Sequence, residues 1–345
     1  MGGDRHDEDF LGARLHARRA RICEVQRLEA LCGLRSLPAL AAELGLDEGL
    51  TTARAFERHL LRELVAESRS LVAESQSPAA RLVRWMLARL QLELLKVVLR
   101  GQGARADRAL VREQLFELPA GPDPDALLAA SSPEETVDLL GDEALQRVVE
   151  QALTRHGPDA LLLFESALTQ GYYQELLARA RRVEGGEGGW LVELMAQEAD
   201  TFHLMLVARG RFHEGVPAEA LRRLHVEGTA LSRTRYRDML ASPDLAAAAR
   251  HALERVIDRM PRLDDASRLA ARLERQCWAR YLRLARRVFR RSEMGPGLLI
   301  AYVALRRIEV ANLVTIAEGL RLAVPAELLR ARLLPGAGEE EARAA

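Results

Sequence analysis

Asp200 and His203 are the two residues whose types and spacing come closest to a metal site. Residues three apart share one face of a helix, so their carboxylate and imidazole would point the same way. A di-iron helical bundle needs two Glu-x-x-His pairs and two further glutamates on facing helices. The sequence offers one imperfect copy, so we favour a hydrogen bond between helices and expect no metal and no cofactor.

Other motifs that carry catalysis are absent from the sequence. Lys96 is the only lysine, which excludes the Gly-x-x-x-x-Gly-Lys phosphate loop. Neither a His-Glu-x-x-His motif nor a Gly-x-Ser-x-Gly nucleophile elbow occurs. Cys23, Cys32 and Cys277 give no disulfide framework and no Cys-x-x-Cys pair. The sequence favours a non-catalytic protein, and an α-helical enzyme with an unrecognised polar pocket stays as an alternative.

Polar residues interrupt the most apolar helical stretches. Arg306, Glu309 and Asn312 stand three apart within residues 298–316, which are apolar almost all round. Buried polar groups need partners, because an unmade hydrogen bond costs about 1–3 kcal/mol. We therefore expect Glu309 and Asn312, like Asp200 and His203, to tie helices together within and between bundles.

Arginine-rich helical faces are the candidate partner surfaces. One apolar stretch carries a polar stripe at i, i+4, i+7 and i+11, formed by Arg89, Glu93, Lys96 and Arg100. An N-terminal cluster includes Arg14 and Arg18. A solvated face is the alternative to a partner contact in each case. The candidate partner-interface residues are Arg14, Arg18, Arg89, Glu93 and Arg100.

An internal repeat organises the helices that position these residues. Three helical stretches, 84–101, 193–210 and 302–319, each end at a glycine, the usual stop for a helix. Successive glycines of this set are 109 residues apart. An aromatic or Leu residue followed by Glu precedes each glycine at a similar distance. Solenoid units are shorter, typically 20–45 residues. The repeat therefore predicts three small helical bundles related by duplication.

Breaks rich in Gly, Pro and Ser mark the ends of these bundles. Examples are the Ser-Gln-Ser-Pro run at 75–78 and the glycine-rich run at 185–189. The predicted divisions are a flexible N-terminus at 1–9, helical repeats at 10–120, 121–228 and 229–334, and a flexible acidic tail at 335–345.

Composition supports an all-α, soluble protein. The residues are mostly strong helix formers, and aromatic residues make up only 4%. The 50 basic and 50 acidic residues balance, whereas a nucleic-acid binder usually carries a basic field. The longest apolar run is far shorter than the roughly 20 residues of a membrane-spanning helix. We therefore expect no nucleic-acid partner and no direct insertion into a membrane.

Three segments resemble the family of C-type subunits of V/A-type ATPases, whose eukaryotic members are called d. The first is FLGARLHAR at 10–18, which is similar to the family's first helix. The second is FESAL with YYQELL at 164–177, and the third is YVALRRIEVANL at 302–313, followed by Gly319 and Pro325. The sequence departs from the family where Leu305 and Arg306 replace Lys-Glu, and where Gln91 and Leu94 replace a frequent Asp and Asn.

The resemblance implies a central-stalk protein with no catalytic role. Members of this family look like a funnel of three pseudo-threefold-related bundles. The funnel sits on the proteolipid (c/K) ring and receives the axle subunits D and F, so that it passes torque during proton or sodium transport. The implied location is the cytoplasmic face of the cell membrane, reached indirectly through the ring. A free-standing α-helical scaffold or adaptor is the alternative function.

Overall fold

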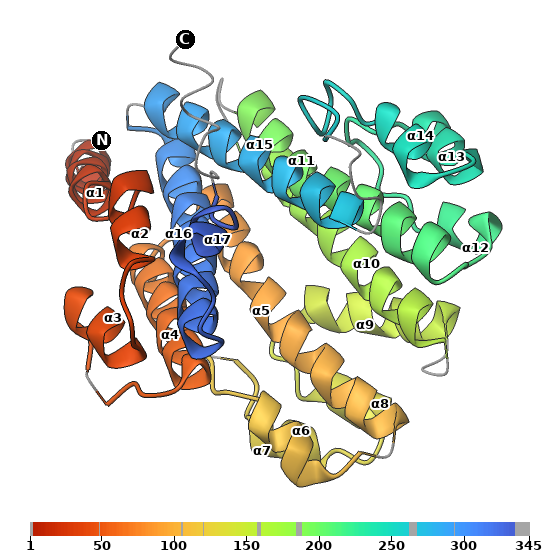
Figure 1. Ribbon diagram of the computed structural model, residues 1–345, viewed down its shortest axis with the longest axis horizontal. Helices are drawn as coiled ribbons and strands as arrows, with labels where there is room; N and C mark the ends of the chain where they lie inside the picture. Colours follow the sequence, from red (N-terminus) through yellow and green to blue (C-terminus); the bar gives the residue numbers. More distant parts are fainter. Residues whose placement is uncertain are drawn as a thin grey trace. The chain divides into compact units, whose positions relative to one another are not determined.

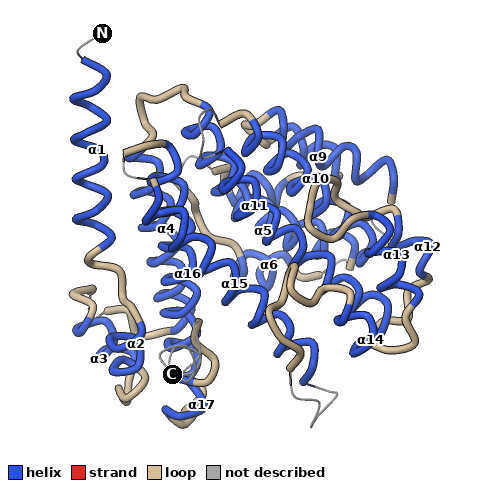
Figure 2. Tube along the Cα trace, turned by 90° about the horizontal axis from the view of Figure 1, so that it is seen from above, coloured by secondary structure: helices blue, strands red, loops and turns tan. Residues whose placement is uncertain are grey.

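The computed structural model describes residues 3–47, 49–104, 106–119, 121–156, 160–183, 188–261, 268–292 and 294–334. Regular structure in these ranges is helical, with no strand, so the predicted all-α class is confirmed (Figures 1 and 2). The chain divides into two compact units. Unit 1 comprises residues 1–74 and 285–345, and unit 2 comprises residues 75–284. Helix α15 (Leu269–Arg291) crosses the boundary.

Unit 1 brings the two ends of the chain together. Its helices are α1 (Gly3–Arg19), α2 (Val25–Leu31), α3 (Leu37–Glu43), α4 (Ala53–Leu71), α16 (Pro296–Arg321) and α17 (Ala326–Arg330). Helix α16 packs along α4 (Figure 1). Phe56, Leu60 and Leu64 recur every fourth residue on α4 and are buried in one core with Leu313 and Ile316 of α16. This spacing is the apolar stripe of an amphipathic helix.

Unit 2 is built around α10 (Leu161–Arg181). Its other helices are α5 (Pro78–Gly103), α6 (Arg108–Gln114), α7 (Pro124–Ala129), α8 (Pro133–Asp138), α9 (Glu143–Arg155), α11 (Gly188–Leu206), the π-helix η1 (Val207–His213), α12 (Ala218–Arg222), α13 (Arg233–Ala241) and α14 (Leu245–Arg250). Helix α10 packs against α5, α9 and α11. Tyr172 on α10 stacks on Trp85 of α5 with ring centroids 5.6 Å apart. The Trp85 Nε1–H also donates to the Tyr172 carbonyl at 3.0 Å.

Short polar residues and prolines set where the long helices begin. Thr52 caps α4, because its hydroxyl accepts a hydrogen bond from the Ala55 N–H. Ser77 does the same for α5 through the Ala80 N–H, and Pro78 occupies the first turn, where a missing N–H costs nothing. The predicted break at 75–78 is therefore the start of α5.

The prediction that Gly101, Gly210 and Gly319 stop their helices is wrong. Helix α5 continues to Gly103, η1 continues through His213, and α16 continues to Arg321. The glycines with positive φ among the described residues are Gly45, Gly215 and Gly228. The left-handed conformation that ends a helix is therefore absent at the three repeated glycines.

The other predicted divisions stay predictions. Residues 3–9, within the segment predicted to be flexible, form the beginning of α1. The tail at 335–345 and most of the glycine-rich run at 185–189 lie outside the described residues. The boundaries between three bundles stay predictions. No helix within the described ranges has both the length and the apolar character that a membrane span requires.

Candidate functional site

A half-buried carboxylate of unit 1, Glu67 on α4, joins three helices. Its Oε1 accepts hydrogen bonds from Arg18 Nη1 of α1 at 2.9 Å and from the Tyr302 hydroxyl of α16 at 2.6 Å. Its Oε2 accepts from Arg306 Nε of α16 at 3.0 Å. Burial raises the pKa of Tyr302, and the bond to Glu67 raises it further. Glu67 therefore fixes α1 and α16 against α4.

Glu309 extends this network to the start of α2. Its Oε1 accepts from the backbone N–H of Cys23 at 2.6 Å, and its other oxygen pairs with Arg306. Arg306 replaces a glutamate that is usual in the resembled family. In this chain its guanidinium bridges two carboxylates, Glu67 and Glu309. The arrangement satisfies charges that would be costly if buried alone.

Asn312, one turn further along α16, holds the end of the described chain. Its Nδ2 donates to the Leu334 carbonyl at 2.8 Å, and its Oδ1 accepts from the Leu334 N–H at 2.9 Å. Asn312 is only 3% exposed. A side-chain amide offers a donor and an acceptor together, so it satisfies both backbone groups of one residue.

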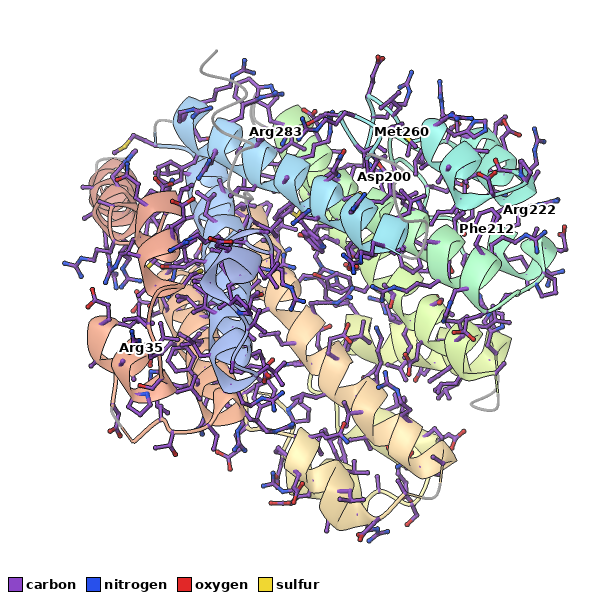
Figure 3. The ribbon with its side chains drawn as sticks, viewed as in Figure 1. Arg35, Asp200, Phe212, Arg222, Met260 and Arg283 are labelled. Carbon is purple, nitrogen blue, oxygen red and sulfur yellow. The ribbon has the colours of Figure 1, made fainter. Side chains whose placement is uncertain are left out.

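Asp200 on α11 of unit 2 binds the chain just before α13 (labelled in Figure 3). Its two oxygens accept from the N–H groups of Ala230 at 2.8 Å and Leu231 at 3.0 Å. The carboxylate is 1% exposed. Hydrogen bonds from two backbone donors satisfy this buried carboxyl group, which would be costly to bury without partners.

His203 lies one turn beyond Asp200 and accepts from the Val226 N–H through Nε2 at 2.8 Å. This bond places the ring proton on Nδ1, which faces Asp200 Oδ1 at 3.4 Å. Burial lowers the pKa of His203, and the neighbouring Asp200 opposes that shift. His203 is therefore a neutral acceptor at neutral pH.

His225 completes the buried cluster of unit 2. Its ring stacks on His203 with centroids 4.8 Å apart and planes 2° from parallel. Its Nε2 faces the Leu231 carbonyl at 2.8 Å, where it donates. Its Nδ1 is buried and lies 3.7 Å from Glu227, beyond hydrogen-bond distance. The imidazoles join backbone segments and do not converge on a common point, and the described residues contain no cluster of three or more side chains suited to a metal ion.

The predicted stripe on α5 is paired within unit 2. Glu93 binds Arg89 at 2.9 Å and Lys96 at 3.1 Å, and Arg100 binds Glu165 of α10 at 2.7 Å. Arg89 also lies over the ring of Tyr172, 5.5 Å from its centroid. About half of the Glu93 and Arg100 side chains stays exposed, 46% and 48%.

The two predicted interface arginines of α1 differ in their surroundings. Arg18 bonds Glu67 and is part of the unit 1 network. Arg14 is half-buried and has no ion pair among the residues that the structure describes. Of these two arginines, Arg14 is the one whose charge is not paired with a carboxylate among the described residues.

The cysteines are poorly suited to nucleophilic chemistry. All three are free and buried. Burial raises the pKa of Cys23 to about 11 and that of Cys277 to about 12. The thiolate is the reactive form of cysteine, so these thiols are almost entirely protonated at neutral pH.

Sequence reasoning missed Glu67, Tyr302 and Arg306 as a connected group. Glu67 lies 235 residues before Tyr302, and no local pattern links residues so far apart. The replacement of the family's glutamate by Arg306 was the available signal, because a charge change on a buried helix requires a partner. His225 was also missed, since it lies outside the repeated helices.

Comparison with known families shows a match that covers most of the chain. The sequence model of a family described as ATP synthase (C/AC39) subunit matches residues 11–332. No curated protein matches the chain. The matched range runs through both units, from Arg14 to beyond Asn312, so it includes all the candidate residues.

Proposed function

The chain belongs to the ATP synthase (C/AC39) subunit family, and we propose that it acts as the rotor socket of a V/A-type ATPase. The resemblance to the C-type and d-type subunits is thereby confirmed. Family membership makes the chain a non-catalytic stalk subunit of a rotary ATPase, with partners inside that complex. The proposal adds that it receives the axle subunits D and F and joins them to the proteolipid ring.

The family match over residues 11–332 is the observation that carries this proposal. The polar network of unit 1 is consistent with a torque-bearing part, because Glu67 links three helices that are far apart in sequence. Close-packed interiors transmit strain with little deformation. The proposed location is the cytoplasmic face of the membrane, reached through the ring.

We also propose that three duplicated bundles form a funnel, and the repeated glycines support the duplication. A Cβ on Gly101 would lie 2.6 Å from Val111, one on Gly210 would lie 3.2 Å from Leu221, and one on Gly319 would meet Leu329. The contacted residue lies 10 or 11 positions further along each time. Each glycine carbonyl also accepts a backbone N–H from five or six residues later, at 2.8–2.9 Å. Each glycine thus allows the short helix that follows it to pack closely against the longer helix.

Ion pairs beside these glycines also support the duplication. Arg100 precedes Gly101 and binds Glu165 at 2.7 Å, and Arg209 precedes Gly210 and binds Glu274 at 2.8 Å. Glu165 and Glu274 are the repeated glutamates that precede Gly210 and Gly319, and Glu57 is the equivalent residue before Gly101. We call these three glutamates the acidic anchors, so each arginine binds the acidic anchor of the next copy. In the proposed arrangement, the second helix of one copy therefore pairs with the first helix of the next.

The polar pairs on the second helices have corresponding partners as well. Asn312 binds Leu334, 22 residues later, and His203 binds Val226, 23 residues later. Asp200 holds the chain entering the next copy, and Glu309 holds Cys23 at the start of the first. In the first copy, Gln91 stands at the position of Asp200. Its Nε2 lies 3.8 Å from where a Cβ on Gly121 would be, at the start of the second copy.

Capture of the complex from membranes tests the rotor proposal. The tagged chain, expressed in its own host, is purified from detergent-solubilised membranes and its partners are identified. Recovery of a proteolipid ring with axle subunits is expected. Recovery of the chain alone would overturn the proposal and favour a helical scaffold or adaptor.

Arg14→Glu tests whether α1 contributes to the partner surface. We expect the recovery of partners to fall roughly tenfold or more, as for loss of a charged contact. The melting temperature should stay unchanged. Arg21→Glu is the matched control, because Arg21 is exposed just beyond the end of α1 and has no ion pair among the described residues. Equal recovery with both variants would remove Arg14 from the proposed interface.

A further inference from the structure

A pocket of about 670 Å³ opens in unit 1 between the end of α1, the start of α2 and the last turns of α15. Four arginines line it, one from α1, one from α2 and two from α15: Arg19, Arg27, Arg286 and Arg290. Glu24 is the single acidic residue in the lining. Its volume falls in the range of small-molecule sites, about 300–1,000 Å³.

The arginines outnumber the carboxylate, and two of them are not neutralised. Glu24 pairs with Arg19 and lies 3.6 Å from Arg286. Arg27 makes one long hydrogen bond, 3.4 Å, to a backbone carbonyl. Neither Arg27 nor Arg290 has a carboxylate partner among the described residues. Since the whole chain has a formal net charge of +0, this excess is local to the pocket.

The rest of the pocket wall is partly apolar. Ile22, Val25 and Phe289 contribute to the lining. The His16 ring meets Phe289 edge-on with centroids 5.1 Å apart, and the Arg19 guanidinium lies 5.9 Å from the Phe289 centroid. The pocket therefore combines fixed apolar surface with guanidinium groups, the usual composition of a site for an organic anion.

We propose that this pocket binds a ligand carrying two or more phosphate groups. A guanidinium presents paired N–H donors that match phosphate oxygens, and arginine keeps its charge at any physiological pH. Arg27 and Arg290 stand on different helices, α2 and α15, so each can hold a separate phosphate. A second phosphate group would let each of the two arginines bind a phosphate of its own. This proposal does not rest on the proposed rotor function.

Titration of the purified full-length chain with tripolyphosphate, followed by calorimetry, tests the proposal. We expect saturable binding that is tighter than that of orthophosphate and that weakens as ionic strength rises. In Arg27→Ala/Arg290→Ala, affinity should fall roughly tenfold or more, as for loss of two charge-assisted hydrogen bonds. Arg21→Ala/Arg287→Ala removes the same charge nearby, outside the pocket lining, and should bind as the unaltered chain does.

A second experiment distinguishes the two possible sources of such phosphates, a lipid headgroup and a free ligand. Sedimentation with vesicles of cardiolipin and phosphatidylcholine reports binding of a lipid headgroup, and tripolyphosphate reports a free ligand. Binding of either probe that is lost only in the pocket variant supports the proposal and identifies the source. Binding of neither probe, or equal weakening in both double variants, overturns it. Because no other protein is used, the outcome is independent of whether the chain assembles into a rotor.

Discussion

Helix α16 of unit 1 and helix α11 of unit 2 hold neighbouring backbone with different chemistry. On α16, Glu309 accepts from one backbone N–H and Asn312 satisfies both backbone groups of Leu334. On α11, Asp200 accepts from two N–H groups and His203 from one. In both helices an acidic residue is followed three positions later by an acceptor. The comparison teaches that each of the four residues accepts a backbone N–H, while the second acceptor changes from an amide to a titratable imidazole.

The largest expected effect on stability is that of replacing Asp200, the acidic residue of the polar pair on α11 in unit 2. Asp200→Ala removes the acceptor of the exposed Ala230 N–H and of the buried Leu231 N–H, and it removes the partner of His203. We expect a loss of about 3–5 kcal/mol in unfolding free energy, since a hydrogen bond to a charged group contributes about 1.5–3 kcal/mol. Denaturant unfolding followed by circular dichroism measures it.

Glu193→Ala on the same helix is the control, because Glu193 is exposed. It should change stability by less than about 0.5 kcal/mol. Similar unfolding midpoints for Asp200→Ala and Glu193→Ala would show that the buried carboxylate does not hold the chain before α13.

Asn312 is the second residue of the polar pair Glu309 and Asn312 on α16 of unit 1. Asn312→Leu removes its amide without creating a large cavity. The N–H and carbonyl of Leu334 lose their partners, which should cost about 2–4 kcal/mol. Thr315→Ala is the matched control, since Thr315 is more exposed on the same helix and its hydroxyl bonds only the Ala311 carbonyl. An unchanged melting temperature for Asn312→Leu would exclude the proposed anchoring role.

The sequence predicts some parts of this molecule well because their causes are local. The start of α5 follows from Ser77 and Pro78, which cap and begin a helix wherever they occur together. The all-α class follows from composition and helical periodicity. The expectation for Gly101 and Gly319 is wrong, because a glycine that ends a helix and one that admits a close side chain look alike in sequence. Their contacts with Val111 and Leu329 appear only in the packed structure.

The sequence singles out four polar residues that are buried in the structure, but it does not reveal their partners. Apolar surroundings marked Asp200, His203, Glu309 and Asn312 as buried polar residues that need hydrogen bonds. Their partners are mostly backbone groups of loops, and backbone has no sequence signature. Glu67 joins residues 49 to 239 positions away, which no periodicity reveals.

The imidazole of unit 2 should make its backbone contact sensitive to pH, and the amide of unit 1 should not. The pKa of His203 is lowered, so the unfolded chain binds its proton more tightly than the folded chain does. The stabilising contribution is complete above the ordinary histidine pKa of about 6.5 and is lost as the pH falls below it. Protonation of Nε2 also removes the acceptor for Val226.

Hydrogen exchange at two amides measures this difference. Between about pH 7.5 and about pH 5.5, protection of the Val226 N–H should fall at least about fivefold, corrected for intrinsic exchange, as for loss of one hydrogen bond. Protection of the Leu334 N–H should stay constant. In His203→Asn, protection at Val226 should become independent of pH. An equal decline at both amides would mean that acid acts on the whole fold rather than on His203.

The smallest effect concerns charges beside the repeated glycines. Arg100 and Arg209 bind glutamates in unit 2, but the residue before Gly319 in unit 1 is Glu318. Glu318 lies near Glu57, the acidic anchor of the first copy. Burial raises the pKa of Glu57, Arg54 opposes that shift, and Glu318 raises it further. Unit 1 therefore has two carboxylates where unit 2 has an arginine and a carboxylate.

Glu318→Arg should convert this repulsion into an ion pair with Glu57. The gain is limited to about 0.5–1 kcal/mol, because exposed pairs contribute little and the present Glu318–Arg321 pair at 2.7 Å is lost. Thermal unfolding should show a rise of a few degrees that shrinks as salt screens the pair. Glu63→Arg makes the same charge change at an exposed position of α4 and should leave the melting temperature unchanged. If both variants raise it equally, general charge explains the gain, and the correspondence between Glu318 and the two arginines fails.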